Sequence, residues 1–464
     1  MAYLHEKNTG AILQTGSMID FEMDPVVHKE NGMVYFNHQP IQTARSNQAV
    51  LCLVVDIGTT TVIVSLIDCV SHEEIASKSD LNPQRQYGQE VLSRITHVQQ
   101  YGDEGLKELQ RMIVKTIESL GKELCTENGY HPEDIFAIFT ASNTVMDHLL
   151  MGESPIGLGV APYEMAFKNR QARYFKEVGI ETLGRGVIVS LPNVSAFVGG
   201  DIVAGMISTG IYAHNGCELF IDIGTNGELI LEKEGKLYST SCAAGPALEG
   251  MNISCGINAQ DGAIEEAKME DSTLRLQTIS EQPAIGICGS GILAIVREFL
   301  QAGLILKSGN IIKADAVPDK LAHFLVADKK ALWVDKDLGI YITQKDIRQI
   351  QLAKGAIISG IHFLLRESGV TAEEIDRVYI AGQFGSYLSA DSLTVVGLLP
   401  EVLHERIEYV GNTSKSGCYM VAMSKGLYNE LDHIVSNVHH IELSVLTDFD
   451  RVFARNARFT VKGD

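Results

Sequence analysis

Short apolar runs alternate with longer amphipathic stretches from Leu51 onward. In LVVDIGTTTVIVSLID, an apolar strand ends at Asp56, and a second strand follows one glycine and three threonines. Residues 104–124 and 345–369 place apolar side chains at the three- and four-residue spacing of a helix. Strands that alternate with helices in this way predict an α/β protein.

A second copy of the D-I-G-T motif lies in ELFIDIGTNGELILEKEGK. Again a buried strand ends at an aspartate, Asp222, and a returning strand follows a glycine-containing turn. We therefore predict a duplicated architecture, with one strand–turn–strand motif in each half. A P-loop and a dinucleotide fingerprint are excluded, because both need a glycine-rich turn that leads into a helix, whereas these turns lead into strands.

The two turns carry the residue types of an anion and metal site. A tight turn after a strand directs backbone N–H groups into one concavity, which binds anions. Hydroxyl donors are added by Thr59, Thr60, Thr61 and Thr225. Asp56 and Asp222 are placed to hold Mg²⁺ or to orient a water molecule. The sequence predicts that both turns clamp a triphosphate and its Mg²⁺; the alternative for each is an ordinary β-turn.

Two glycine-rich segments follow. GICGSGIL opens into a helical pattern, and a helix N-terminus behind Gly289, Ser290 and Gly291 suits phosphate or ribose. VYIAGQFGSYLS predicts a strand that ends near Gly382 and Gln383, where the backbone passes close to a flat ligand such as adenine.

Composition excludes several classes of protein. The 464 residues predict two or three folding units, and 45% hydrophobic with 21% charged residues is typical of a globular protein. No apolar run reaches the ~18 residues of a membrane span, and the first residues are no secretion signal, so we expect a cytoplasmic protein without membrane contact. A net charge of −20 argues against a nucleic-acid partner.

The four motifs, in this order, resemble those of the acetate kinase, sugar kinase, Hsp70 and actin (ASKHA) superfamily. In that superfamily two ribonuclease-H-like domains hold ATP in the cleft between them. Longer motifs narrow the resemblance to the ATPase part of the reductive activators of corrinoid proteins, the RACo-like family. These motifs are LNPQRQYGQEVLSRI, SNTVMDHLLMG, FVGGDIVAG, AAGPALEG, DIRQIQLAKGAI and GLLP.

The resemblance implies roles for individual residues. The first phosphate turn would comprise Asp56, Gly58, Thr59 and Thr60. The second would comprise Asp222, Gly224, Thr225 and Asn226. Gly289, Ser290, Gly291, Gly382 and Gln383 would approach the nucleoside. Asp201 would act as base or metal ligand; its alternative role is the N-cap of a following helix.

The resemblance also implies a function. ATP binding and hydrolysis would drive the return of Co(II) to Co(I) in a corrinoid protein partner, and the chain would form a homodimer. Residues 1–48 are polar and weakly periodic, so we expect an extension with local order around MVYFN. A first ribonuclease-H-like subdomain (49–195) and a second one (196–464) would follow.

The chain differs from typical members of that family in its electron carrier. Typical activators have an iron–sulfur domain, whereas residues 1–48 contain no cysteine and the eight cysteines of the chain form no C-x-x-C pair. We therefore expect no iron–sulfur cluster and a separate, ferredoxin-like electron donor. Two alternatives stay open: a paralogue with another task, and a cluster shared between subunits through Cys242 and Cys255.

Other functions of the same fold stay open as well. A small-molecule kinase would need a base near the acceptor hydroxyl, and Asp201 is the candidate. A nucleotide-binding scaffold without turnover is the third possibility.

Overall fold

The structure is a computed structural model that describes residues 21–45, 48–88, 90–327, 329–382 and 388–459. The chain divides into two compact units. Unit 1 takes in Met1–His214 and Asn412–His440, and unit 2 takes in Asn215–Gly411 and Ile441–Asp464. Each unit is therefore discontinuous in the sequence. The predicted division at residues 195 and 196 stays a prediction about domain boundaries.

Unit 1 is built on a mixed sheet. The strands that lie within the residues of this unit, in this sheet or in others, are β1 (Val27–Glu30), β2 (Met33–Phe36), β3 (Gln39–Thr43), β4 (Leu51–Ile57), β5 (Thr61–Asp68), β6 (Glu74–Leu81), β7 (Ile135–Ser142), β8 (Gln171–Tyr174), β9 (Val187–Ser190) and β20 (Val438–His440). Its helices are α1 (Val91–Glu127), α2 (Thr144–Met151), α3 (Gly200–Thr209), α7 (Thr413–Ala422) and α8 (Lys425–Ser436).

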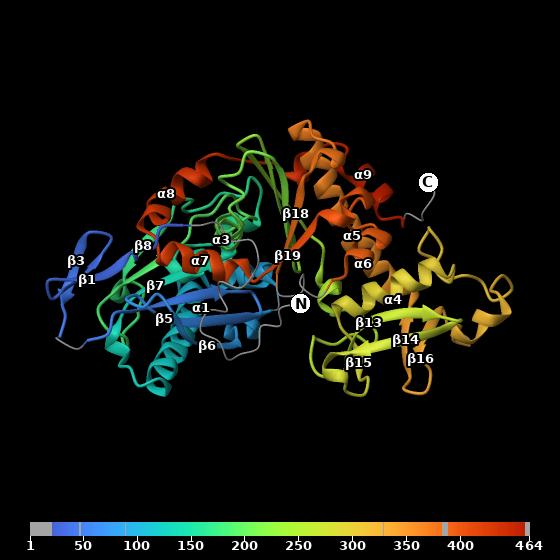
Figure 1. Cartoon of the computed structure of the whole chain (residues 1–464), viewed down its shortest axis with the longest axis horizontal. Helices are drawn as coiled ribbons and strands as arrows, with labels where there is room; N and C mark the ends of the chain where they lie inside the picture. Colours follow the sequence, from blue (N-terminus) through green and yellow to red (C-terminus); the bar gives the residue numbers. More distant parts are fainter. Residues whose placement is uncertain (1–20, 46–47, 89, 328, 383–387, 460–464) are drawn as a thin grey trace. The chain divides into compact units, whose positions relative to one another are not determined.

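The central sheet of unit 1 has the strand order β6-β5-β4-β7-β9-β8. Strand β4 pairs antiparallel with β5 and parallel with β7. It is apolar along most of its length because both faces are covered: Leu51, Leu53 and Val55 share a core with α1, and α7 packs on β4 and β7. Figure 1 draws the red helices α7 and α8 beside the blue and green elements of this unit.

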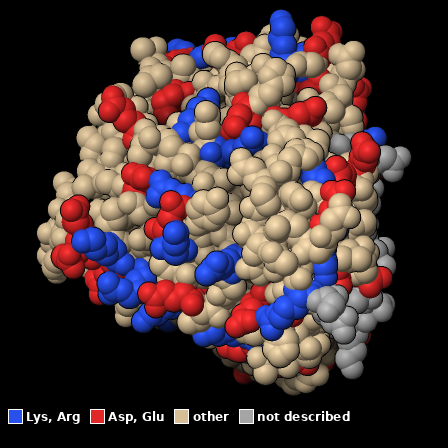
Figure 2. Space-filling view, turned by 90° about the vertical axis from the view of Figure 1, so that its left-hand side faces the viewer, with Lys and Arg blue, Asp and Glu red and all other residues tan. Residues whose placement is uncertain are grey.

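The N-terminal segment forms a small sheet of its own. Strands β1, β2 and β3 pair antiparallel, so the order expected around MVYFN is confirmed and extends over Val27–Thr43. On the side of β1, β3, β8 and α8, the surface carries basic and acidic side chains next to one another rather than a field of one sign (Figure 2).

Unit 2 repeats this plan with additions. Its strands are β10 (Cys217–Ile223), β11 (Gly227–Lys233), β12 (Lys236–Cys242), β13 (Ala263–Glu270), β14 (Thr273–Thr278), β15 (Gly286–Ile287), β16 (Ala331–Asp335), β17 (Ile340–Thr343), β18 (Arg377–Ala381) and β19 (Ile407–Gly411). Its helices are α4 (Gly289–Gln301), α5 (Gln344–Ser368), α6 (Ala390–Val396) and α9 (Phe449–Asn456).

The central sheets of the two units share one topology. In unit 2 the strands run in the order β12, β11, β10, β18 and β19, which corresponds to β6, β5, β4, β7 and β9 in unit 1. As in unit 1, the central strand β10 pairs antiparallel with β11 and parallel with β18. The predicted duplication, with one D-I-G-T hairpin in each half, is confirmed.

The predicted helices are also present. Helix α5 begins after Thr343, whose hydroxyl accepts a hydrogen bond from the Asp346 N–H, and ends at Gly369 in the left-handed conformation. Helix α1 begins at Val91, earlier than predicted, and Gly102 interrupts it with a non-helical backbone (φ 59°). Among the described residues, no helix has both the length and the apolar character needed to span a bilayer.

Candidate functional site

The first D-I-G-T turn is closed by its own backbone and held by Asn82. The Gly58 N–H donates to the Thr61 carbonyl (2.9 Å). Asn82 donates from its side-chain amide to the Gly58 carbonyl (2.9 Å) and from its backbone N–H to the Thr60 carbonyl (2.8 Å). The N–H groups of Thr59 and Thr60 donate no hydrogen bond within the described part of the chain. Two backbone donors are thus left for an external acceptor.

Asp56, at the end of β4, is held by the first turn of α7. Asn412 Nδ2 donates to Asp56 Oδ2 (2.8 Å), and Ser414 Oγ donates to Oδ1 (2.9 Å). Burial raises the pKa of Asp56, while these two hydrogen bonds and the charge of Lys415 lower it in part. Each carboxylate oxygen accepts one hydrogen bond and keeps a further lone pair, so the geometry fixes the group without using up its capacity as a cation ligand.

A third element meets the first turn at Thr59. Asn143 Nδ2 donates to Thr59 Oγ1 (3.2 Å), and Asn143 Oδ1 accepts from the Met146 N–H (3.0 Å). Asn143 is the N-cap of α2, so one amide side chain both caps this helix and orients the threonine hydroxyl. The turn is therefore braced by Asn143, between β7 and α2, and by Asn82, directly after β6.

Asp201 lies in the first turn of α3, where its Oδ1 accepts the Ile202 N–H (2.9 Å). The N-cap of this helix is Gly199, so the alternative that Asp201 caps it is wrong. A Cβ at Gly199 would lie 2.5 Å from the Ser142 carbonyl, so glycine lets α3 begin directly against the end of β7. The predicted role of Asp201 as base or metal ligand stays a prediction.

The second D-I-G-T turn has a different support. The Gly224 N–H donates to the Asn226 carbonyl (2.9 Å), and the Gly245 N–H donates to the Thr225 carbonyl (2.7 Å). Thr225 Oγ1 donates to Glu249 Oε1 (2.6 Å). Burial raises the pKa of Glu249, and its hydrogen bonds from Thr225 act in the opposite direction. A half-buried carboxyl thus fixes the one threonine hydroxyl of this turn.

Asp222 is packed against Gly382. In the register of β10 and β18, Asp222 lies opposite Ala381, the residue before this glycine. Gly382 has a φ of +94°, and a Cβ there would lie 2.6 Å from Asp222 Oδ1. Only glycine fits such a close approach at a positive φ. The neighbouring Gln383, a predicted nucleoside contact, lies outside the described residues.

The glycines at the start of α4 are explained by packing. A Cβ at Gly289 would lie 1.8 Å from the Leu248 carbonyl, and one at Gly291 would lie 2.0 Å from the Ile264 carbonyl. Ser290 between them is buried. The sequence signal here has a structural cause, and contact of these three residues with a nucleoside stays a prediction.

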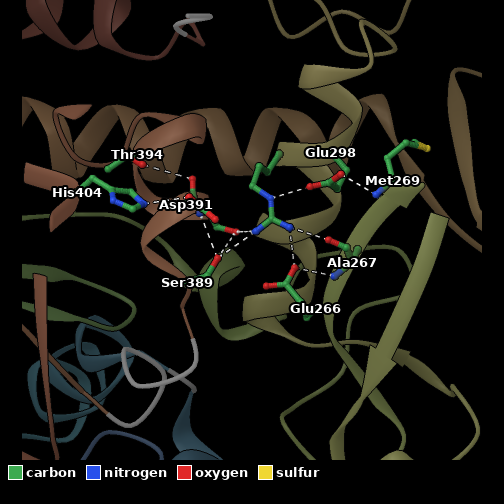
Figure 3. A network of polar contacts seen from close by, with 10 residues as sticks. Glu266, Ala267, Met269, Glu298, Ser389, Asp391, Thr394 and His404 are labelled. Atoms are coloured by element: carbon green, nitrogen blue, oxygen red, sulfur yellow. Dashed lines mark hydrogen bonds and ion pairs between the residues drawn. The ribbon is translucent and has the colours of Figure 1, made fainter. Parts of the chain in front are cut away.

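The C-terminal half of α4 is tied to its neighbours by Arg297, and Figure 3 labels Glu266, Glu298 and Ser389 among its partners. Arg297 Nε donates to Glu298 Oε1 (2.9 Å), and Nη2 donates to Glu266 Oε1 (2.8 Å). Nη1 donates to the hydroxyls of Ser392 (2.9 Å) and Ser389 (3.1 Å). Ser389 is the N-cap of α6, so this one guanidinium links β13, α4 and α6.

The cysteines show no metal-binding arrangement. Cys242 is buried, its thiol donates to the Gly227 carbonyl (3.2 Å), and burial raises its pKa. Cys255 is half-buried. No group of three or more His, Cys, Asp or Glu residues placed to hold a metal ion occurs among the residues that the structure describes.

Several contacts of the two turns were not predicted from the sequence. They come from Asn82, Asn143, Glu249, Asn412 and Ser414. The signal that was available is the position of Asn143 and Asn412, each directly before a helix, where asparagine is a preferred N-cap.

Family comparisons match almost the whole described chain. A model described as the RACo middle region matches residues 51–214, and a model described as the C-terminal domain of RACo, the ASKHA domain, matches residues 216–463. The boundary between the two models lies next to the first boundary between units 1 and 2.

Individual relatives agree with these matches. The chain is 31% identical to the corrinoid activation enzyme RamQ of Eubacterium limosum over 87% of this chain and 69% of that protein. It is 25% identical to a [Co(II) methylated amine-specific corrinoid protein] reductase of Methanosarcina barkeri, over 63% of this chain and 56% of the relative. A solved structure described as a reductive activator for a corrinoid, iron–sulfur protein has a TM-score of 0.80 and 33% identity, and the match covers 94% of this chain and 70% of that one.

Proposed function

The chain belongs to the RACo family, and on this premise we propose that it binds ATP and uses it to reactivate a corrinoid protein. The observation that carries the proposal is the match to a corrinoid activation enzyme across 87% of the chain. The shared topology of the two central sheets, each with an aspartate-led hairpin at the same place, supports nucleotide binding in addition.

The proposed reaction transfers one electron. A separate, ferredoxin-like protein gives up the electron, Co(II) in the corrinoid partner accepts it, and Co(I) results. Hydrolysis of ATP with water to ADP and phosphate supplies the free energy for this uphill step. ATP biases the partner only if the nucleotide-bound chain binds one state of the corrinoid protein more tightly than the other.

The residues of the two turns fit a magnesium nucleotide. The N–H groups of Thr59 and Thr60, which donate to no described residue, are proposed donors for phosphate oxygens. Asp56 and Asp222 are the proposed Mg²⁺ ligands, because carboxylate oxygens are the donors that Mg²⁺ prefers. A bound Mg²⁺–ATP would supply the phosphoanhydride that is hydrolysed. Asn412 and Ser414 then keep Asp56 in place, and Gly382 leaves room for the Asp222 carboxylate.

A reconstitution assay tests this function. The purified chain is mixed with a corrinoid protein in the Co(II) state, a reduced ferredoxin and Mg²⁺–ATP, and the visible spectrum of the corrinoid is followed. We expect conversion to Co(I) that requires ATP and the chain together, and that Asp222→Asn slows. A conversion rate that is the same without the chain would contradict the proposal.

The same assay separates the alternatives. A kinase would hydrolyse or transfer phosphate independently of any corrinoid protein and would leave a phosphorylated metabolite, which phosphorus NMR detects. Absence of ATP binding in calorimetry would refute both enzymes. The homodimer is proposed from the family resemblance, and light scattering measures it.

A further inference from the structure

Arg94 is a fully buried arginine with an unusual set of partners. It lies in the first turns of α1, with none of its surface exposed. Nη2 donates to the Thr59 carbonyl, and Nη1 donates to Gln84 Oε1 (3.2 Å) and to the sulfur of Met146. Its Nε finds no hydrogen-bond partner among the described residues. All of these partners are neutral.

Among the residues that the structure describes, no negative charge compensates this guanidinium. Within the described part of the chain, no carboxylate forms an ion pair with Arg94, and the charge that acts on it most is that of Arg85, a second cation. Burial, and then Arg85, lower the pKa of Arg94 to about 10. The group is therefore still protonated at neutral pH. A buried charge without a partner costs free energy, so a compensating gain is expected elsewhere.

The position of Arg94 points to that gain. Its Nη2 touches the carbonyl of Thr59, the middle of the first D-I-G-T turn. The same turn has two N–H groups, those of Thr59 and Thr60, that donate to no described residue. An uncompensated cation beside unpaired backbone donors forms a site for an anion.

We infer that Arg94 is the buried counter-charge for a phosphate group bound at the Gly58–Thr61 turn. The inference rests on the proposed function and deepens it, because it identifies a residue that favours a polyphosphate over an uncharged ligand. Arg94 holds the turn through the Thr59 carbonyl and places its positive charge behind the backbone donors. It is a positioning residue, and no direct contact with the ligand is required.

The test compares ligands of different charge on matched variants. Arg94→Met removes the charge, Arg94→Lys keeps it, and Lys354→Met is the control. Lys354 is also a buried cation bonded to carbonyls, those of Asn456 (2.8 Å) and Arg458 (2.6 Å), but it lies in α5. Calorimetry measures the Kd of ATP, adenosine and tripolyphosphate for each protein.

We expect Arg94→Met to weaken ATP binding at least about tenfold. It should leave adenosine binding unchanged, since adenosine carries no phosphate. Arg94→Lys should recover most of the ATP affinity, and Lys354→Met should bind ATP like the wild type. Tripolyphosphate should compete with ATP for binding to the wild-type protein. Added salt should weaken the binding of tripolyphosphate more than the binding of adenosine.

Several results would overturn the inference. One is ATP affinity of Arg94→Met equal to that of the wild type; another is an equal loss for ATP and adenosine, which would mean a purely structural role. If Arg94→Met does not fold, failure of tripolyphosphate to compete on the wild type overturns it instead. Absence of any ATP binding by the wild type would count against the proposed function. In that case tripolyphosphate tests the site: weaker binding to Arg94→Met than to the wild type supports the inference, and equal binding overturns it.

Discussion

Two buried arginines, one in each unit, have opposite surroundings. Arg94 in α1 and Arg297 in α4 expose 0% and 7% of their surface. Arg297 has two carboxylates, Glu266 and Glu298, and two serine hydroxyls as partners. Arg94 has a carbonyl, an amide oxygen and a thioether. The guanidinium is thus paired with carboxylates in unit 2 and has no carboxylate partner among the described residues in unit 1.

The difference separates a structural arginine from one that serves a ligand. A buried ion pair with satisfied hydrogen bonds fixes the packing of the elements that supply it, here β13, α4 and α6. A cation without a counter-charge contributes little to such packing and is expected where a ligand brings the opposite charge. Of these two arginines, Arg297 is therefore the one with complete internal pairing, and Arg94 is the one for which we propose a ligand as the counter-charge.

The largest loss of stability on substitution is expected at Arg297. Arg297→Met leaves Glu298 buried and Glu266 half-buried without their cation, and it should lower the free energy of unfolding by about 3 kcal/mol. Urea unfolding followed by circular dichroism measures this. Arg94→Met should cause a smaller loss, because it removes a buried charge and leaves none behind.

An exposed arginine gives the matched control. Arg45 pairs with Glu133 at 2.6 Å on the surface, and Arg45→Met should change the stability by no more than about 1 kcal/mol. Equal losses for Arg94→Met and Arg297→Met would mean that both arginines are structural, and the comparison would fail.

A second test uses a buried acid of unit 1. Asp147 in α2 accepts a hydrogen bond from Asn193 Nδ2 (2.6 Å), whereas its Oδ1 is unpaired within the described residues. Burial raises its pKa from 3.8 to about 7. Between these two values the folded state holds a proton that the unfolded chain has lost, so stability falls as the pH rises through this window. The full shift corresponds to about 4 kcal/mol.

Asp147→Asn should therefore remove this pH dependence and make the protein more stable than the wild type at pH 8. The introduced amide also has a donor for Asn193 Oδ1, which lacks a partner in the described structure. Urea unfolding at pH 5 and pH 8 measures the slope. The exposed Asp337→Asn is the control and should keep the wild-type slope; an unchanged slope in Asp147→Asn would mean that this carboxyl does not titrate there.

The third test concerns the glycine beside Asp222. Gly235 in the β11–β12 turn has a φ of +80° and open space around it, so Gly235→Ala should cost only about 1–2 kcal/mol of backbone strain. Gly382→Ala adds a Cβ that would lie 2.6 Å from Asp222 Oδ1 and should cost about 1–3 kcal/mol more. Thermal unfolding of both variants measures the difference.

The affinity of the same two variants for Mg²⁺–ATP gives a second measurement. Gly382→Ala displaces the carboxylate proposed to hold Mg²⁺, so it should weaken Mg²⁺–ATP, while Gly235→Ala should not. Equal affinities in the two variants would argue that the position of Asp222 does not matter for the ligand.

Local patterns were enough to predict the hairpins and helix α5. The D-I-G-T turns follow from apolar runs interrupted by glycine and threonine, and α5 follows from its periodicity and Gly369, whereas the capping Thr343 is added by the structure. The glycines of GSG were also found, although packing against Leu248 and Ile264 explains them without a ligand.

The partners of the turns could not be predicted because they are distant in the sequence. Asn412 and Ser414 lie 356 and 358 residues from Asp56. Arg94 lies in a segment that resembles the family, but nothing in its charge distinguishes it from an exposed arginine. Arg94 lies directly before Ile95 and four residues before Val98, on the buried stripe of α1. This helical spacing is the sequence signal that its side chain is buried.

The discontinuity of unit 1 has a consequence for how the chain is made on the ribosome. Asp24 and Val26 donate their N–H groups to the carbonyls of Met423 and Ala422, so the start of the described chain is bonded to a segment synthesised almost 400 residues later. Unit 1 is incomplete until translation has passed its last helix, and α7 must wait for nearly all of unit 2 to emerge. A fragment that stops at His214 would lack the side chains that hold Asp56, so the first half of this protein needs its second half to finish folding.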